Sequence, residues 1–451
     1  MKAYPEYKSS GIDWLGEIPS HWSRMPIKAV LSKSSAGTWG EEPREDGSDI
    51  ICFRVADFDY QHLELGHKNL TYRSVDDRQL IGREVNNGDI VIEKSGGGDI
   101  WPVGRAVISK FDFKATCSNF MHVISTNYRA NNLYLNYLLA TIYMHGINRQ
   151  YFAQTTGIQN LNIKEYLSQQ AYFPPIEEQE AIAAYLDDLT GKVDALIAEK
   201  QKQVEDLRSY RTSLITETVT RGLNPNAPLR PSGIDWLGDI PEHWETTKLK
   251  YITSKIGSGV TPKGGSEVYS DEGILFIRSQ NVYPNGLHLD DPKYISKQID
   301  EAMCNTRVYQ GDILLNITGA SIGRCCVYSL PENANVNQHV CIIRPLPDTI
   351  NNMFLCYVIN SNIGQEQIAM YQTGGNREGL NFEQLKNFTI PLPSFSEQQA
   401  IAEFLDEKTE KIDALIGELE KQLEELAEYK KSVISEAVTG KVDVRDWKPQ
   451  N

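Results

Sequence analysis

The chain has 451 residues, 40% of them hydrophobic and 23% charged, and its formal net charge is −15. A chain of this length is too long for one hydrophobic core, and its composition excludes a largely disordered protein. Its longest mostly apolar stretch, residues 133–144, is shorter than the roughly twenty residues of a membrane span. Residues 1–11 lack the apolar segment of a signal peptide. We therefore expect a cytoplasmic protein of a bacterial or archaeal cell.

The chain begins with an entry segment that recurs 222 residues later. The sequence S-G-I-D-W-L-G at Ser10–Gly16 is repeated without change at Ser232–Gly238, and both copies continue into Ile-Pro-x-His-Trp. A period of this length is too long for a solenoid and predicts duplication of a whole module. Residues 31–80 and 255–305 differ strongly between the copies. This difference suggests one mechanical role with two different ligands.

Each module opens with a globular part that mixes short strands and helices. Residues 88–93 and 311–316 start with Gly-Asp-Ile and have the pattern of strands that follow a turn. Residues 132–153 and 352–371 have the pattern of helices, each interrupted by one glycine. The sequence therefore predicts the α+β class.

A long helix is predicted after each globular part, behind prolines at 174, 175 and 393 that stop the preceding segment. Apolar residues then keep a heptad spacing over about four repeats, which predicts an antiparallel coiled coil of the two helices. Two separate amphipathic helices, each packed on its own domain, are the alternative. The expected helix seam consists of Val193, Ile197, Val204, Leu207 and Leu214 with Ile412, Ile416, Leu419, Leu423, Leu426 and Val433. The expected domains are residues 1–175 and 223–393, with helical spacers at 176–222 and 394–440 and a tail at 441–451.

The negative charge is concentrated in these helical segments. Residues 177–222 hold 10 acids and 6 bases, and residues 394–440 hold 12 acids and 5 bases. A nucleic-acid binder usually carries a basic footprint. The globular parts are left near neutrality, which permits contact with DNA without proving it.

The seven cysteines, at positions 52, 117, 304, 325, 326, 341 and 356, include no C-x-x-C pair. Neither a disulfide framework nor a zinc site fits this spacing, and buried free thiols in a reducing compartment are expected.

Catalytic motifs are missing from the sequence. It has no G-x-x-x-x-G-K-[ST] phosphate loop, no G-x-G-x-x-G after a strand and no Asn/Asp-Pro-Pro-aromatic tetrapeptide. His21 and His243 recur beside tryptophans in the entry segment, which favours a structural role. The Asp406-Glu-Lys408 sequence has the residue types of part of a nuclease carboxylate set, but it lies on a predicted helix and no partner acid is placed nearby. We predict no catalytic residue, no cofactor and no metal.

The tandem entry segments and the Glu-Gln-x-Ala-Ile-Ala exits at Glu178–Ala183 and Glu397–Ala402 resemble the specificity subunit of Type I restriction-modification enzymes. The resemblance covers essentially the entire chain. It implies two target-recognition domains, each reading half of a split site in double-stranded DNA. It also implies helices that act as a spacer and as a platform for two methyltransferase (modification) subunits, with motor-nuclease (restriction) subunits joining them. In that family the specificity chain cuts nothing itself.

DNA sequence is read by donor-rich side chains on loops, so turns with Gly, Thr, Gln, Asn, Lys and Arg are the candidates. They lie at a strand end, after the Gly-Asp-Ile strand and after the predicted helix of each copy. For any single residue, a turn or a surface ion pair is an equally good interpretation. The candidates for DNA contact are Arg54, Asp57, Lys94, Ser95, Arg105, Thr155, Thr156, Gln159 and Asn160 in the first copy and Arg278, Gln280, Asn281, Asn316, Thr318, Arg324, Gln372, Thr373, Asn376 and Arg377 in the second.

Two other functions remain open at this point. A methyltransferase fused to its own recognition unit would bind S-adenosylmethionine with this chain alone. A duplicated adaptor would bring proteins together through its helices without touching DNA.

Overall fold

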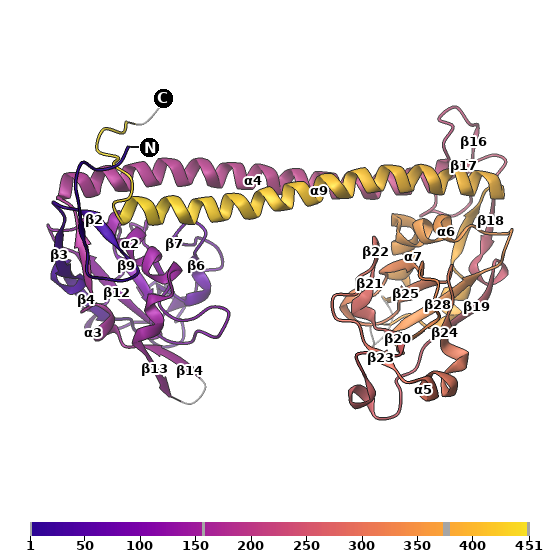
Figure 1. The fold of residues 1–451 in the computed structure, drawn as a ribbon, viewed down its shortest axis with the longest axis horizontal. Helices are drawn as coiled ribbons and strands as arrows, with labels where there is room; N and C mark the ends of the chain where they lie inside the picture. The colour runs from indigo at the N-terminus through magenta and orange to yellow at the C-terminus, as the bar shows by residue number, and fades with distance from the viewer. Residues whose placement is uncertain (1, 156–157, 373–378, 449–451) are drawn as a thin grey trace. The chain divides into compact units, whose positions relative to one another are not determined.

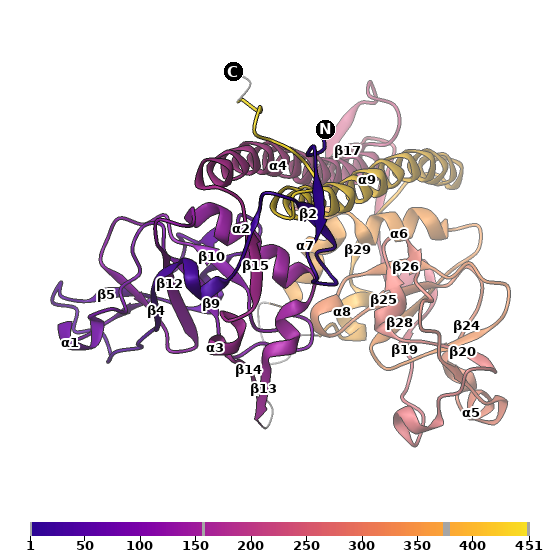
Figure 2. The ribbon, with the colours of Figure 1, turned by 60° about the vertical axis from the view of Figure 1, so that its left-hand side comes forward.

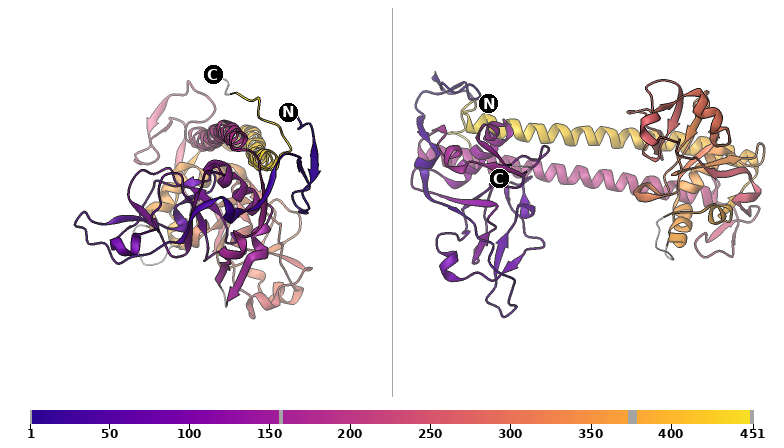
Figure 3. Two further views of the ribbon diagram at one scale, coloured as in Figure 1. Left: turned by 90° about the vertical axis from the view of Figure 1, so that its left-hand side faces the viewer. Right: turned by 90° about the horizontal axis from the view of Figure 1, so that it is seen from below.

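The computed structural model describes residues 2–155, 158–372 and 379–448. The chain forms two compact units, one of residues 1–201 with 421–451 and one of residues 202–420. The first unit therefore combines an N-terminal and a C-terminal segment of the chain (Figure 3). Lys2 forms a β-bridge with Asp443 there.

The first unit is built on a six-stranded sheet in the order β4-β12-β9-β10-β7-β6 and a three-stranded sheet in the order β11-β5-β8. Helix α2 (Asn132–Met144) supplies buried residues to the main core, and the β13–β14 hairpin projects on the side away from the long helices (Figures 1 and 2). The strands are β1 (Tyr7–Ser9), β2 (Glu17–Pro19), β3 (Ser23–Pro26), β4 (Leu31–Ala36), β5 (Ile50–Phe53), β6 (Phe58–Asp59), β7 (Glu64–Leu65), β8 (Tyr72–Arg73), β9 (Ile90–Glu93), β10 (Ala106–Ile108), β11 (Ala115–Cys117), β12 (Met121–Thr126), β13 (Phe152–Thr155), β14 (Ile158–Leu161) and β15 (Gln170–Phe173), and the short helices are α1 (Asp77–Leu80) and α3 (Ile163–Tyr166).

The second unit repeats this plan with two four-stranded sheets, in the orders β19-β28-β25-β26 and β23-β20-β27-β24. Helices α6 (Asn352–Asn360) and α7 (Asn362–Gln372) supply buried residues to its core. Its strands are β16 (Leu229–Pro231), β17 (Asp239–Pro241), β18 (Glu245–Lys248), β19 (Thr253–Ser258), β20 (Ile274–Ile277), β21 (Val282–Tyr283), β22 (Gly286–Leu287), β23 (Tyr294–Ile295), β24 (Arg307–Val308), β25 (Ile313–Asn316), β26 (Cys325–Val327), β27 (Ala334–Val336), β28 (Val340–Pro345) and β29 (Thr389–Leu392), and its short helices are α5 (Lys297–Ala302) and α8 (Phe382–Lys386).

Two long helices, α4 (Ile176–Arg221) and α9 (Phe395–Val438), contribute to both units. In the first unit Lys430 Nζ of α9 lies 2.6 Å from Asp194 Oδ2 of α4. Lys200 Nζ donates to Gln422 Oε1 at 2.6 Å. From the first contact to the second, the residue number rises in α4 and falls in α9, so the two helices are antiparallel. Val193, Ile197 and Val433 are buried in this part of the seam, and Leu423 and Leu426 are half-buried.

The same pairing continues in the second unit. Arg208 Nη2 lies 2.7 Å from Glu420 Oε1, and Arg211 Nε lies 2.9 Å from Asp413 Oδ1. The predicted antiparallel coiled coil is thus confirmed, and the alternative of two separate helices is wrong. The seam residues of this unit comprise Val204, Ile412 and Ile416, which are buried, and Leu207, Leu214 and Leu419, which are half-buried.

The recurring entry and exit segments of the sequence meet at one junction in each unit. Glu178, in the first turn of α4, accepts hydrogen bonds from Trp22 Nε1 at 2.9 Å and from the hydroxyl of Tyr4 at 2.7 Å. Its other carboxylate oxygen lies 2.7 Å from His21 Nε2. In the second unit His243 Nε2 lies 2.8 Å from Glu397 Oε1 at the start of α9. The recurring histidines therefore join the domain entrance to its helix.

Three expectations from the sequence need correction. The predicted helix at 132–153 is too long, because Gly146 adopts a φ of 69°, the left-handed conformation that ends helices, and residues 152–155 form β13. The helix at 352–371 is two helices that are separated at Ser361. Cys304 is exposed, whereas the other six cysteines are buried, and all seven are free.

Among the described residues, no helix is long and apolar enough to cross a membrane.

Candidate nucleic-acid interface

In the first unit, the turn that follows β9 is joined to strand β14. Ser95 Oγ donates to Asn160 Oδ1 at 2.6 Å, and the backbone N–H of Gly96 donates to Gln159 O at 3.1 Å. The backbone N–H groups of Lys94 and Ser95 both donate to Phe120 O. Two clusters that are about 65 residues apart in the sequence, the 94–96 turn and the 159–160 strand, therefore form one surface.

Arg54 and Asp57 form the next part of this surface. Arg54 precedes a short 3₁₀ helix (Val55–Asp57), and its backbone N–H donates to Asp57 Oδ2 at 2.7 Å. Its Nη2 lies 3.0 Å from Asp57 Oδ1. The Asp57 carboxylate is buried and is occupied by these bonds, so it holds Arg54 in place. A cavity of about 510 Å³ opens beside them, and its lining includes Trp39, Arg54, Ser95, Asn119 and Phe120.

Arg105 does not line this cavity, but it is bonded to Glu93, which does. Its Nε donates to Glu93 Oε2 at 2.8 Å, and Glu93 is only 2% exposed and lines the cavity. Burial raises the pKa of Glu93, and the Arg105 guanidinium opposes this rise. The guanidinium carbon also lies 5.7 Å from the ring centre of Trp101, whose side chain is 58% exposed. Arg105 is therefore oriented by a buried carboxylate beside an exposed aromatic ring.

The second unit builds its surface at the corresponding place. Asn316, at the end of β25, is fully buried and donates through Nδ2 to Ser279 O at 2.8 Å. Thr318 Oγ1 lies 2.5 Å from His339 Nδ1, and Gln338 Nε2 lies 2.9 Å from His339 Nε2. Thr318 also forms a β-bridge with Gly379. Asn316 fixes the turn, whereas Thr318, Gln338 and His339 form a polar row beside it.

Arg278 and Asn281 repeat the geometry of Arg54 and Asp57. The backbone N–H of Arg278 donates to Asn281 Oδ1 at 3.0 Å, and the buried Asn281 donates to His288 O at 2.9 Å. The Arg324 guanidinium carbon lies 4.7 Å from the ring centre of Tyr283. A cavity of about 530 Å³ has a lining that includes Gln280, Tyr283, Thr318, Arg324 and His339.

The two cavities are therefore two versions of one site. Each is bounded by the turn after β5 or β20, by the turn after β9 or β25, and by the loop before β12 or β28. Their side chains differ: Trp39, Phe120 and Glu93 line the first, and Tyr283, His339 and Arg324 line the second. The two sites therefore share one frame and offer a ligand different hydrogen-bonding side chains.

Some sequence candidates lie elsewhere or outside the described residues. Thr155 ends β13, beside this surface on the β13–β14 hairpin, and Gln372 ends α7. Thr156, Thr373, Asn376 and Arg377 lie outside the described residues.

Sequence reasoning missed several residues that line the cavities, namely Trp39, Asn119, Phe120, Tyr283 and His339. One signal was available: Asn119-Phe120 and Gln338-His339 are 219 residues apart, the offset that also relates other parts of the repeat. The described residues contain no group of three His, Cys, Asp or Glu side chains arranged to hold a metal ion.

A two-copy fold with paired polar cavities and paired helices defines a duplicated recognition protein. Residues 76–206 and 241–425 match the family model of the Type I restriction modification DNA specificity domain. This match covers more than half of the chain, which belongs to that family.

Known proteins of the family extend the likeness over most of the chain. The type I restriction enzyme MjaVIII specificity subunit of Methanocaldococcus jannaschii is 26% identical over 372 residues, 80% of this chain and 81% of that protein. A provisionally named MjaX specificity subunit of the same organism is 25% identical over 96% of each chain. A solved structure, titled as the structural basis of complex assembly and conformational transition of the type I R-M system, shares the fold at a TM-score of 0.68. It is 17% identical and covers 93% of this chain and 98% of its own.

Proposed function

We propose that this chain is the DNA-specificity subunit of a type I restriction-modification complex in the cytoplasm, and that it is not itself an enzyme. In this proposal the domains at 1–175 and 223–393 each read one half of a bipartite, non-palindromic site. The spacers at 176–222 and 394–440 set the separation of the half-sites. They also dock two methyltransferase subunits, which restriction subunits join.

One observation carries the proposal: the same frame of three loops surrounds a cavity in each unit, with different donor side chains in each. Arg324, Thr318 and Gln280 in the second cavity offer donors that suit base edges and phosphates. An adaptor that binds only proteins would not require paired cavities of this polarity. The buried Asp57, Asn281 and Asn316 support the frame, so they are positioning residues in this proposal.

The test is a band-shift of the complete complex with its methylated target and with random DNA. Arg324→Gln should weaken specific binding about tenfold or more, equivalent to roughly 1–3 kcal/mol for a lost base contact, and relax only the second half-site. Lys2→Gln removes one positive charge outside both cavities and both spacers, where Lys2 pairs with Asp446, and serves as the control. Equal binding of specific and random DNA by the unmodified complex would contradict the proposal.

A further inference from the structure

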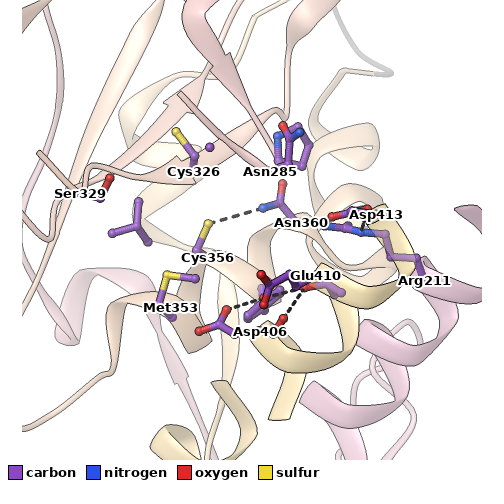
Figure 4. Close-up of a pocket in the computed structure, with 15 residues that line it drawn as sticks. Arg211, Asn285, Cys326, Ser329, Met353, Cys356, Asn360, Asp406, Glu410 and Asp413 are labelled. Carbon is purple, nitrogen blue, oxygen red and sulfur yellow. Dashed lines mark hydrogen bonds and ion pairs between the residues drawn. The ribbon is translucent and has the colours of Figure 1, made fainter. Parts of the chain in front are cut away.

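A second kind of cavity, of about 570 Å³, lies in the second unit between α6, α9 and the β21–β22 hairpin (Figure 4). One wall carries the carboxylates of Asp406, Glu410 and Asp413, all on α9. Their spacing of four and three residues places them on one helix face, about 6 and 4.5 Å apart along the axis. The sulfur-bearing side chains of Met353 and Cys356 lie across from them (Figure 4).

The charge of the carboxylate wall is only partly balanced. Asp413 forms an ion pair with Arg211 at 2.9 Å. Asp406 accepts a hydrogen bond from the neutral hydroxyl of Tyr357 at 2.6 Å. Within the described part of the chain, neither Asp406 nor Glu410 forms an ion pair. The cavity therefore combines a negative wall, which Arg211 compensates only at Asp413, with the apolar side chains of Met353 and Cys356.

The first unit contains the same arrangement of helices, which allows a direct comparison. Tyr137 lies 3.3 Å from Thr190 Oγ1 through its hydroxyl, just as the Tyr357 hydroxyl lies 3.1 Å from Thr409 Oγ1. The ion pair of Lys430 with Asp194 likewise stands where Arg211 pairs with Asp413. By the same offset of 219 residues, Asp187 corresponds to Asp406.

In the first unit, a loop of the chain occupies the position that corresponds to this cavity. The loop at 60–63, between β6 and β7, packs there: Leu63 is 3% exposed, and its carbonyl accepts from Asn136 Nδ2 at 2.9 Å. Lys430 Nζ also donates to Gln61 O at 2.6 Å.

The first unit also supplies an alkylammonium group of its own. Lys110 Nζ lies 2.7 Å from Glu64 Oε2. Burial lowers the pKa of Lys110, but the carboxylates of Glu64 and Asp187 outweigh it and hold the pKa above its ordinary value. In the first unit, Asp187, the counterpart of Asp406, therefore lies near the ammonium group of Lys110.

The second unit has neither the longer loop nor the lysine at the corresponding positions. The β21–β22 loop has residues 284–285 where the first unit has residues 60–63. Ser329 stands at the position of Lys110, and Cys356 stands at the position of Asn136, which anchored the loop. The second unit keeps the carboxylate of Asp187 as Asp406, has Glu410 where the first unit has Gly191, and has lost the lysine and the longer loop of the first unit.

We propose that this cavity binds a linear aliphatic polyamine such as spermidine. Its ammonium groups would pair with Asp406 and Glu410, and its methylene chain would lie against Met353 and Cys356. A propyl or butyl spacer between amines matches carboxylates placed on successive turns of one helix. A hydrated divalent cation would use the carboxylates and leave the apolar wall in contact with water. This inference does not depend on the proposed DNA recognition.

Calorimetric titration of spermidine into the full-length chain without DNA, at fixed ionic strength, tests the proposal. We expect saturable binding of one molecule, weakened at least tenfold in the double variant Asp406→Asn/Glu410→Gln. The control Glu403→Gln/Glu407→Gln neutralises two exposed carboxylates of α9 that do not line the cavity and should leave binding unchanged. Equal weakening by the control variant, or equal heats with Mg²⁺, would overturn the proposal.

A second variant tests the comparison between the units without removing a carboxylate. Ser329→Lys gives the second unit the ammonium group that Lys110 supplies in the first, at an exposed position. It should fold normally and lose spermidine binding. Unchanged binding in Ser329→Lys would place the ligand elsewhere and contradict the assignment.

Discussion

The indole of Trp22 and the carboxylate of Glu178 are joined by a hydrogen bond of 2.9 Å that ties the start of the first domain to the first turn of α4. The two residues are 156 positions apart in the sequence. Trp22 is 1% exposed and Glu178 is 6% exposed, so neither group has water as a substitute partner. The bond therefore determines how the long helix leaves the domain.

We expect Glu178→Ala to destabilise the protein by about 2–4 kcal/mol, because it leaves the buried Trp22 Nε1 and the Tyr4 hydroxyl without an acceptor. Urea unfolding followed by tryptophan fluorescence would measure this loss. Glu177→Ala, at the exposed neighbouring position, is the control and should stay within about 0.5 kcal/mol of the unmodified protein. Equal stability of the two variants would show that the junction does not depend on this carboxylate.

The helix seam gives a second prediction. Ile416 is 8% exposed at a seam position, whereas its neighbour Leu415 is 51% exposed. Ile416→Asp places an unpaired charge in the seam and should cost about 3 kcal/mol or more, while Leu415→Asp should cost far less. Thermal unfolding compares the two. Similar melting temperatures for both variants would contradict the buried seam.

The stability of the first unit should depend on pH through the titration of His122. Burial, with a smaller contribution from Lys94, lowers the pKa of His122 from 6.5 to about 4. Between pH 6.5 and about pH 4, His122 is therefore protonated in the unfolded chain and neutral in the folded chain. Stability from this group is complete above pH 6.5 and falls as the pH drops toward 4, by about 2 kcal/mol after allowance for partial exposure.

His122→Gln keeps a polar partner for Ser34, which lies 2.8 Å from His122 Nε2, and removes the titration. Its urea midpoint should change less between pH 7 and pH 5 than that of the unmodified protein. His67→Gln, at an exposed position, is the control. An identical pH dependence in all three proteins would refute the assignment.

The isolated chain should bind DNA weakly. The counterion release that drives non-specific affinity needs a basic surface, and the chain carries a net charge of −15 with its globular parts near neutrality. Tight specific binding should appear only with methyltransferase subunits attached. Nanomolar, salt-resistant binding by the chain alone in a band-shift would contradict this expectation.

The long helices and their pairing could be predicted from the sequence because the heptad pattern is local. The burial of a residue such as Ile416 can be predicted from the spacing of the apolar residues around it. The recurring entry segment likewise identified the duplication. The junction that Trp22 forms with Glu178 could not be predicted, since nothing in either segment specifies its distant partner.

The candidate interface was only partly predictable for the same reason. Turn residues with donors were identified, but the sequence does not distinguish a side chain that faces solvent from one that bonds its own backbone. Asp57 and Asn281 cap turns, whereas Arg54 lines the cavity that Asp57 helps to form. Trp39 and Phe120 enter that cavity from segments far apart in the chain.

The spacer function makes a quantitative prediction. Deleting one heptad from each helix, residues 198–204 and 418–424, keeps the antiparallel register and shortens the pair by about 10 Å. The gap between the half-sites should then narrow by about three base pairs at roughly 3.4 Å each, and the half-site sequences should stay the same. Exchanging residues 255–305 for those of a relative should instead alter one half-site and leave the gap unchanged.

Methylome sequencing of cells that carry the unmodified protein with its partner subunits tests the central claim most directly. Two diverged reading domains joined by a helical spacer predict a methylated motif of two different short sequences, separated by an unread gap, with centres about one turn of B-DNA apart. A continuous or palindromic methylated motif would contradict the two-reader account.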